Sequence, residues 1–417
     1  MKQVSADPWT WFVALDGGDL DGLSGAAGLL RFAWPSKKVD YRMYDGISGG
    51  HNVSIKPDGQ ALLLGNFSQQ LVAVDTKTLA VINRKTTMQV EEIDYRLRAN
   101  THHIWDGDDS FIGAIGDHLY RVPWASLVDT SNARLAGIKQ LGAHRLWTPH
   151  ELRWNKDKRF IFMGDLGPEN SGARQVGIFD MNTKEPTVIR LPGTVWHVQV
   201  HPTLPIGYAA TYTFATEDDD YVNWSPSYTR EYIFEIDLVS KEVTRSWSFG
   251  AEYPIHLNSD LELYVRDAEV KLYVASGGSH TVVEVDIVDI KAKPRVAFVV
   301  PGVWRRLWNG PFVWRQFKRN LLGAFMRQSP FTGFNYVLQT YQIAGDRFFD
   351  GIYCTRVSPD GSLVVAGARG YNFIRVMKRS DFSTVHHRQL DTLDSGLHLG
   401  LHHSEIRAGE ITGEVGP

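Results

Sequence analysis

Short runs of alternating apolar and polar residues, most of them ending in an acidic residue and a turn, recur along the chain. Five copies lie at residues 71–84, 176–191, 232–247, 282–298 and 373–389. In each copy, two runs with a period of two flank a turn rich in Asp, Asn, Ser or Lys, which is typical of a β-hairpin. A second pair of alternating runs precedes each hairpin, as in HNVSIKPDGQALLLG at 51–65. Each unit therefore predicts four antiparallel strands.

Repeated units of four strands indicate a β-propeller, in which each blade buries its faces against its neighbours. The first strands begin near residues 51, 103, 150, 197, 256, 353 and 403. The N-terminal runs WTWFVALDG and GLLRFAWPSKKVDYRMY lack a first strand, and the C-terminal run LHHSEIRAGEI lacks the strands that should follow it. Joining the two ends completes a blade and removes free sheet edges. We therefore expect an all-β, seven-bladed β-propeller, closed by both ends of the chain, as a single domain over residues 1–417.

One insertion, at residues 301–336, lies in the long interval between the start of the fifth blade, near residue 256, and that of the sixth, near residue 353. No acidic residue lies between Asp289 and Asp346, whereas six basic residues fall in the middle of this stretch. Its bulky aromatic residues recur at helical spacing, which predicts a basic amphipathic helical pair. Three interpretations are open: a lid over the channel, a membrane-surface patch, or a packing cap. As a lid it would favour an apolar or aromatic substrate, with these substrate-binding candidates: Trp304, Trp308, Trp314 and Phe317.

Histidine occupies the start of the first strand in six of the seven blades, and the seventh starts with Tyr353. The first strand of a blade lines the central channel, so these side chains should converge on the axis. Neutral imidazole suits iron, copper, zinc and nickel. We expect one transition-metal ion, iron before copper, manganese or zinc, on ligands drawn from these residues: His51, His103, His150, His197, His256 and His403. The alternative is a structural hydrogen-bond network, as at the Gly-His pairs of WD-type repeats.

Three further side chains are candidates for catalysis. Glu405 lies two residues after His403 on the same strand face, from which it could orient a ligand by hydrogen bonding. Tyr353 replaces histidine at the start of the sixth blade, and Arg230 lies in the acidic loop 214–232, which is expected on a face of the channel. A tyrosine can move a proton, and an arginine can neutralise a carboxylate.

Composition and motifs narrow the classes of function. The net charge of −3 over 417 residues does not indicate nucleic-acid binding. No phosphate-binding loop or dinucleotide fingerprint is present, so we expect a small-molecule substrate and no nucleotide cofactor. A single cysteine, and the lack of a signal peptide or membrane span, favour the cytoplasm. The oligomeric state stays open.

The pattern of one histidine per blade resembles the carotenoid and stilbene cleavage oxygenases. These hold one iron on the axis of a seven-bladed propeller with four histidines, beneath an apolar cap. The run TPHELRWNKDKRFIFMGDLG at 148–167 is similar to a blade of selenium-binding proteins of the methanethiol oxidase type, although their cysteine motifs are absent. Oligogalacturonate and ulvan lyases resemble the predicted architecture and use a metal with catalytic His, Tyr or Arg.

Three hypotheses for the function follow. The first is a metal-dependent enzyme, an oxidase or oxygenase, with a His-ligated mononuclear centre and an apolar or aromatic substrate. The second is a lyase or other acid/base enzyme, such as a cyclase or isomerase, for an anionic substrate such as a uronate oligomer. The third is a non-catalytic interaction propeller, in which the histidines serve stability alone.

Overall fold

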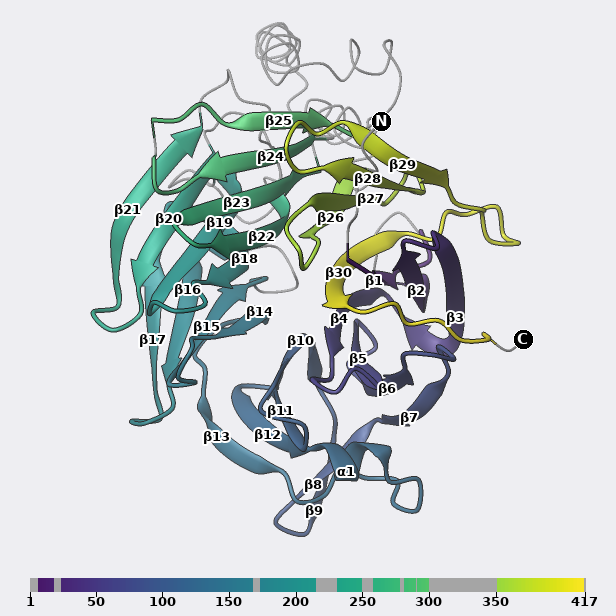
Figure 1. The fold of residues 1–417 in the computed structure, drawn as a ribbon. Coiled ribbons are helices and arrows are strands. Elements are labelled where there is room, and N and C mark those ends of the chain that lie inside the picture. Colours follow the sequence, from purple (N-terminus) through teal and green to yellow (C-terminus); the bar gives the residue numbers. More distant parts are fainter. Residues whose placement is uncertain are drawn as a thin grey trace, which may run out of the picture.

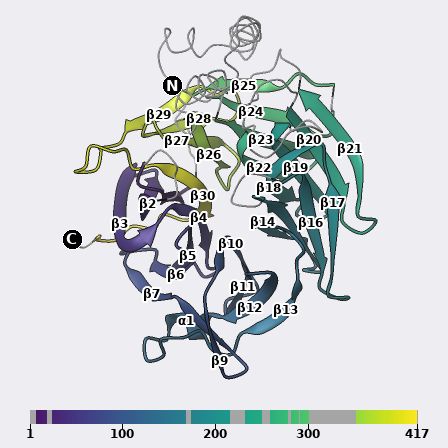
Figure 2. The same ribbon diagram turned by 180° about the vertical axis from the view of Figure 1, so that it is seen from behind.

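Seven four-stranded antiparallel sheets surround one central axis in the structure, which is a computed structural model (Figure 1). It describes residues 7–18, 24–167, 173–214, 231–249, 258–277, 281–289, 291–299 and 351–415. The view from behind shows the same ring of sheets (Figure 2). The prediction of an all-β, seven-bladed propeller is confirmed.

Six blades are built from four consecutive strands each, with the first strand innermost. In chain order they are β4 (Gly50–Ile55), β5 (Ala61–Asn66), β6 (Leu71–Asp75) and β7 (Val81–Lys85); β10 (Ala99–Trp105), β11 (Ser110–Ile115), β12 (His118–Pro123) and β13 (Lys139–Ala143); β14 (Pro149–Trp154), β15 (Phe160–Asp165), β16 (Gln175–Asp180) and β17 (Glu185–Arg190); β18 (Gly193–Val200), β19 (Ile206–Phe214), β20 (Glu231–Asp237) and β21 (Glu242–Phe249); β22 (Asn258–Arg266), β23 (Glu269–Ser276), β24 (Thr281–Asp286) and β25 (Arg295–Phe298); and β26 (Ile352–Val357), β27 (Leu363–Ala368), β28 (Phe373–Lys378) and β29 (Thr384–Gln389).

The remaining blade joins the two ends of the chain. Its order from outside to inside is β3 (Lys38–Ser48), β2 (Ala26–Trp34), β1 (Trp9–Leu15) and β30 (Leu401–Ala408). The C-terminal strand β30 runs antiparallel to β1, with Trp11 opposite Ile406. The ring is therefore closed by backbone hydrogen bonds between the first and last strands of the described chain, as the sequence predicts.

Apolar side chains from adjacent blades form the core. Seven buried clusters lie between neighbouring sheets, one at each of the seven interfaces. At the closing blade, Trp9 and Trp11 are fully buried. The innermost strands also contact one another in cyclic order, from β4 through β10, β14, β18, β22, β26 and β30 back to β4. The axis is thus lined by one strand from every blade.

Few elements of the described chain lie outside the blades. The short helix α1 (Trp124–Val128) and the hairpin of β8 (Thr87–Val90) and β9 (Ile93–Arg96) are additions at the second blade. No helix in the described ranges has the length and apolar character needed to cross a membrane. The insertion at 301–336 lies outside the described residues.

Two glycines on second strands permit close contact between blades near the axis. A Cβ atom on Gly65 of β5 would lie 1.7 Å from the carbonyl oxygen of Thr101 in the next blade. A Cβ atom on Gly164 of β15 would lie 2.1 Å from the carbonyl oxygen of Trp196. Because both obstacles are backbone atoms of inner strands, a side chain at either position would push two blades apart.

We expect Gly65→Ala to lower the free energy of unfolding by about 3 kcal/mol, the upper end of the range for overpacking. Gly113→Ala is the matched control on β11, because its Cβ would meet only the movable ring of His103, at 2.9 Å. This control should lose about 1 kcal/mol. Denaturant unfolding measures both values, and equal losses would contradict the close approach of the backbones.

Candidate metal centre

In every blade, the pairing of the innermost strand with the next strand has a break in register, and these breaks lie at the same level of the channel. The irregularity falls, for example, between Gly50 and Asn52 in β4, between Ala99 and His103 in β10, and between His150 and Leu152 in β14. Equivalent shifts occur along β18, β22, β26 and at the contact of β1 with β30. A bulge breaks strict alternation and re-aims side chains. The bulges therefore decide which residues face the axis.

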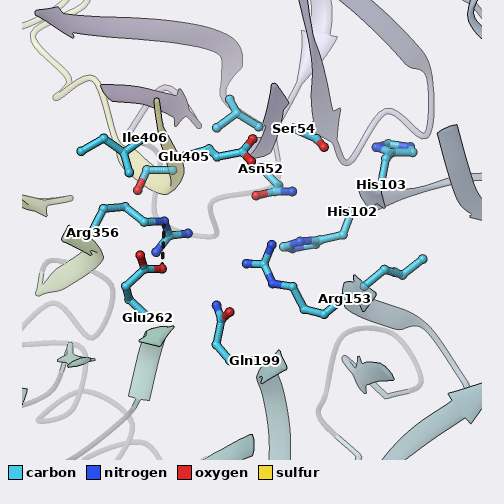
Figure 3. Close-up of a pocket in the computed structure, with 13 residues that line it drawn as sticks. Asn52, Ser54, His102, His103, Arg153, Gln199, Glu262, Arg356, Glu405 and Ile406 are labelled. Carbon is cyan, nitrogen blue, oxygen red and sulfur yellow. Dashed lines mark ion pairs between the residues drawn. The ribbon is translucent and has the colours of Figure 1, made fainter. Parts of the chain in front are cut away.

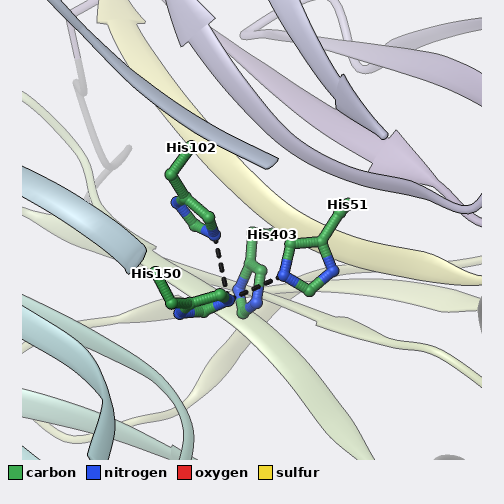
Figure 4. Close-up of side chains that lie close together, drawn as sticks. All are labelled: His51, His102, His150 and His403. Carbon is green, nitrogen blue, oxygen red and sulfur yellow. Dashed lines mark hydrogen bonds between the residues drawn. The ribbon is translucent and has the colours of Figure 1, made fainter. Parts of the chain in front are cut away.

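Four histidines from four blades meet at this level (Figure 4). They are His51, His102, His150 and His403, all of them buried, and one ring nitrogen of each lies within 4.8 Å of those of the other three. The Nε2 atom of His150 lies 2.7 Å from Nε2 of His51 and 3.0 Å from Nε2 of His102. Imidazole nitrogens so arranged are a donor set for a transition-metal ion.

Hydrogen bonding fixes the tautomer of His150. Its Nδ1 lies 2.8 Å from the carbonyl oxygen of Trp196, which can only accept, so Nδ1 carries the proton and Nε2 carries the lone pair. That single lone pair faces the Nε2 atoms of both His51 and His102. A metal-ligating histidine commonly donates its other N–H to a backbone carbonyl in this way. The Nε2 lone pair of His150 is therefore oriented so that it could bind a cation.

Burial keeps the cluster uncharged. It lowers the pKa of His51, His102 and His403 well below 6.5, and each neighbouring imidazole disfavours a second positive charge. Burial and the nearby His197 lower the pKa of His150 to about 3, against the carbonyl of Trp196, which raises it. Neutral imidazole is the form that binds metal.

The structure brings together three of the six predicted ligands, His51, His150 and His403, and adds His102. His103 does not join them. The bulge in β10 turns His102 to the axis, while the ring of His103 packs against Phe111 and Gly113. Its Nε2 is buried, and no residue of the described chain accepts from it or donates to it. The sequence contains two pairs of adjacent histidines, His102–His103 and His402–His403. These pairs indicated that either member could face the axis.

Two more predicted ligands remain, His197 and His256. His197 lies beside the cluster, with its ring centre 5.1 Å from that of His150 and 4.7 Å from that of His403. His256 lies outside the described residues. The sequence interpretation left His402 open; its ring centre lies 4.2 Å from that of His51, and its Nδ1 donates to the carbonyl oxygen of His51.

Of the expected catalytic residues, Tyr353 is buried with its ring centre 4.9 Å from that of His402. Glu405 does not hydrogen-bond a histidine of the described chain. Its carboxylate instead accepts from the backbone N–H of Ile55 at 2.5 Å and so links two blades. Arg230 falls in a part of the chain that is not described. The same holds for the substrate-binding candidates: Trp304, Trp308, Trp314 and Phe317.

A polar cavity of about 190 Å³ adjoins the cluster in the channel (Figure 3). All seven innermost strands contribute to its wall, which includes His102, Arg153, Glu262, Arg356 and Glu405. It is smaller than a drug-sized ligand pocket. Apolar side chains are few in this wall, so the cavity suits a small polar molecule. An apolar or aromatic substrate, as expected from the insertion, finds no counterpart in the described lining.

Burial and neighbouring charges shift the pKa values of the acidic side chains around the cavity. Burial raises the pKa of Glu262 to about 7, against the nearby charge of Arg356. Burial also acts to raise the pKa of Glu151, but Arg153 and His197 outweigh it and hold the value at about 2. Asp260 forms a buried ion pair with Arg356 at 2.6 Å. Sequence reasoning missed these residues, although the charges in HELR at 150–153, on a strand expected at the axis, were a signal.

Comparison with known proteins identifies the fold. No family model and no curated protein matches the sequence. A solved structure described as a putative 6-phosphogluconolactonase from Bacteroides fragilis is 10% identical, with a TM-score of 0.54 over 98% of this chain and 100% of that one. Dihydro-heme d1 dehydrogenase in complex with DHE is 12% identical, with a TM-score of 0.50 over 92% of this chain and 73% of that one. A chain of the mitotic checkpoint complex is 11% identical, with a TM-score of 0.51 over 91% of both.

At these identities the likeness shows the architecture alone. The protein is a seven-bladed β-propeller with a buried histidine cluster that could hold a metal ion. Its structural neighbours are diverse propellers, enzymes among them.

Buried neutral histidines should make the metal-free protein less stable as the pH falls. An unfolded histidine has a pKa near 6.5, whereas that of His150 is about 3. Below pH 6.5 the unfolded state binds a proton that the folded state does not, so this contribution to stability is complete above pH 6.5 and lost toward pH 3. Each such group contributes a slope of about 1.4 kcal/mol per pH unit.

The test is the difference between two proteins, because the carboxyls of Glu262 and Glu405, whose pKa values burial raises, act in the opposite direction. Denaturant unfolding of the metal-free proteins between about pH 5.5 and 4 should show a slope of stability against pH that is less positive in His150→Gln than in the wild type by about 1.4 kcal/mol per unit. Identical slopes would show that His150 is not held neutral.

Proposed function

We propose that this protein is a metal-dependent enzyme whose transition-metal ion binds His51, His102, His150 and His403 in the propeller channel. One observation carries the proposal: the lone pair on Nε2 of His150 faces two imidazole nitrogens within 3.0 Å. A lone pair accepts one good hydrogen bond, so two donors compete for it. A cation among the four nitrogens would use all of their lone pairs at once.

The adjoining cavity supports a catalytic role over a structural one. A cluster that only stabilised the ring would need no free volume beside it, whereas this one has a polar space of about 190 Å³ at His102. We infer that the substrate is small and polar, because arginine, glutamate, glutamine and asparagine side chains line the wall. Residues that position it would include Arg153 and Gln199, which face the cavity (Figure 3).

Oxidation by molecular oxygen is the reaction that we infer first for this centre. The four proposed ligands are all imidazoles, which suit iron and copper, and no carboxylate among them reduces the charge of the ion. The ion would supply the redox chemistry, while the buried ring of blades excludes bulk water and the cavity orients the substrate.

Metal analysis of the purified protein is the first test. We expect iron, copper or another transition metal in at least equimolar amount, and a loss of about one ion per chain in His150→Gln, since His150 has the fixed lone pair at the centre of the cluster. His118→Gln is the control, because His118 is half-buried in β12, away from the four ligands. Wild-type protein that contains no transition metal and binds none on reconstitution would contradict the proposal.

A second candidate is metal-assisted acid/base chemistry, such as elimination, on a small anionic substrate. The cavity wall includes Glu262, whose pKa of about 7 suits proton transfer near neutral pH, and the guanidinium groups of Arg153 and Arg356. A carboxylate substrate would pair with an arginine while Glu262 takes or gives a proton.

Activity with and without oxygen separates the two candidates. Oxygen uptake in the presence of small polar substrates would favour oxidation. Activity under anaerobic conditions, with the absorbance of a new double bond, would favour elimination. In the second case Glu262→Gln should reduce the rate by about 10² or more at unchanged metal content, as expected for loss of a general acid or base. An unchanged rate would remove Glu262 from the mechanism.

A further inference from the structure

A second group of buried donors adjoins the four histidines. His197, Asp260 and His403 each offer one ligand atom, and these atoms lie within 4.8 Å of one another. The three side chains come from β18, β22 and β30, and each is at most 2% exposed. His403 belongs to both groups.

The orientation of His197 is fixed as that of a metal ligand would be. Its Nδ1 donates to Oε2 of Glu151 at 3.2 Å, so its Nε2 carries the lone pair. This Nε2 is buried and has no hydrogen-bond partner among the described residues. A carboxylate that holds the far nitrogen of an imidazole is a common arrangement at metal sites. Glu151 is itself held by the backbone N–H of Val198 and by Arg153.

The carboxylate of Asp260 has room for one more partner. Its Oδ2 accepts from the backbone N–H of Thr355 at 3.0 Å and from Nη1 of Arg356 at 2.6 Å, and its Oδ1 accepts from the backbone N–H of Leu261 at 2.9 Å. A carboxylate has about four lone-pair sites. Three are used in these contacts, so one remains on Oδ1. Ligating carboxylates are commonly hydrogen-bonded in this way.

The charge of Arg356 does not exclude a cation here. Its guanidinium is paired with Asp260 and lies 3.8 Å from a carboxylate oxygen of Glu262. Glu151 places a further carboxylate next to His197, and this carboxylate pairs with Arg153. The surroundings of the second group therefore contain more carboxylates than guanidinium groups.

We propose that the channel holds a second cation position, formed by His197, Asp260 and His403. A neutral imidazole has one lone pair, so His403 serves both positions at once as a bridging imidazolate, with one ion on each ring nitrogen and its N–H proton released to solvent. This rests on the proposed function, since His403 is also a ligand of the four-histidine position. A set of two imidazoles and one carboxylate suits a divalent ion such as zinc, iron or manganese. The two positions differ in donors: four nitrogens in one, two nitrogens and an oxygen in the other.

Metal titration of the whole chain tests the second position. Protein stripped with a chelator is titrated with Zn²⁺ against a competing indicator, and bound metal is counted after gel filtration. We expect two ions per chain in the wild type. The wild-type titration needs no variant, so the result does not depend on how well a mutant folds.

Matched variants assign the two ions. His197→Gln should bind one ion, because it loses the second position alone, and His51→Gln should also bind one, because it loses the first alone. His403→Gln should bind less than one ion per chain, because it disrupts both. Circular dichroism and the melting temperature show that each variant is folded before its metal is counted.

The outcomes are distinct. Wild-type protein that binds one ion, with His197→Gln also binding one, would overturn the second position and leave the proposed function standing. One ion in the wild type that is lost in both His197→Gln and His51→Gln would mean a single position that spans both groups, which also overturns the proposal. No ion in the wild type would overturn the proposed function itself.

Discussion

The pairing of β30 with β1 is the contact on which the rest of the structure depends. It closes the ring and brings the C-terminal histidines to the axis beside residues near the other end of the chain. The hydrogen bond from His402 Nδ1 to the carbonyl oxygen of His51 joins residues that are 351 positions apart. Without β30, the strand β1 would lose its hydrogen-bonded partner and become the inner edge of its blade, and the cluster would lose His403. The fold and the candidate metal centre are thus consequences of the same closure.

The buried histidine cluster lowers the stability of the fold if nothing binds to it. Burying polar groups without full hydrogen bonding lowers stability. Here Nε2 of His150 faces two imidazole nitrogens, and Nε2 of His197 has no partner among the described side chains. Both rings are fixed through Nδ1, by a backbone carbonyl and by a carboxylate. A cation in the four-histidine group would use the lone pair of His150, and a cation in the proposed second position would use that of His197.

The sequence predicted the architecture because hairpins are local and repeat. Alternation, turn residues and the incomplete units at the two ends were enough for seven blades and their closure. Strand phase near the axis was harder, because bulges interrupt the alternation. Simple alignment therefore chose His103, whereas the bulge in β10 turns His102 to the axis. The positions of Glu151 and Asp260 next to the histidines depend on contacts between blades, which no local pattern reports.

One crystallographic measurement tests the central claim most directly. An anomalous difference map, collected at the absorption edge of the metal found in the protein, should show a peak on the channel axis. The account predicts this peak at about 2.1 Å from a nitrogen of each of His51, His102, His150 and His403. A map without a peak there, with the four imidazoles hydrogen-bonded to one another in metal-replete crystals, would contradict it.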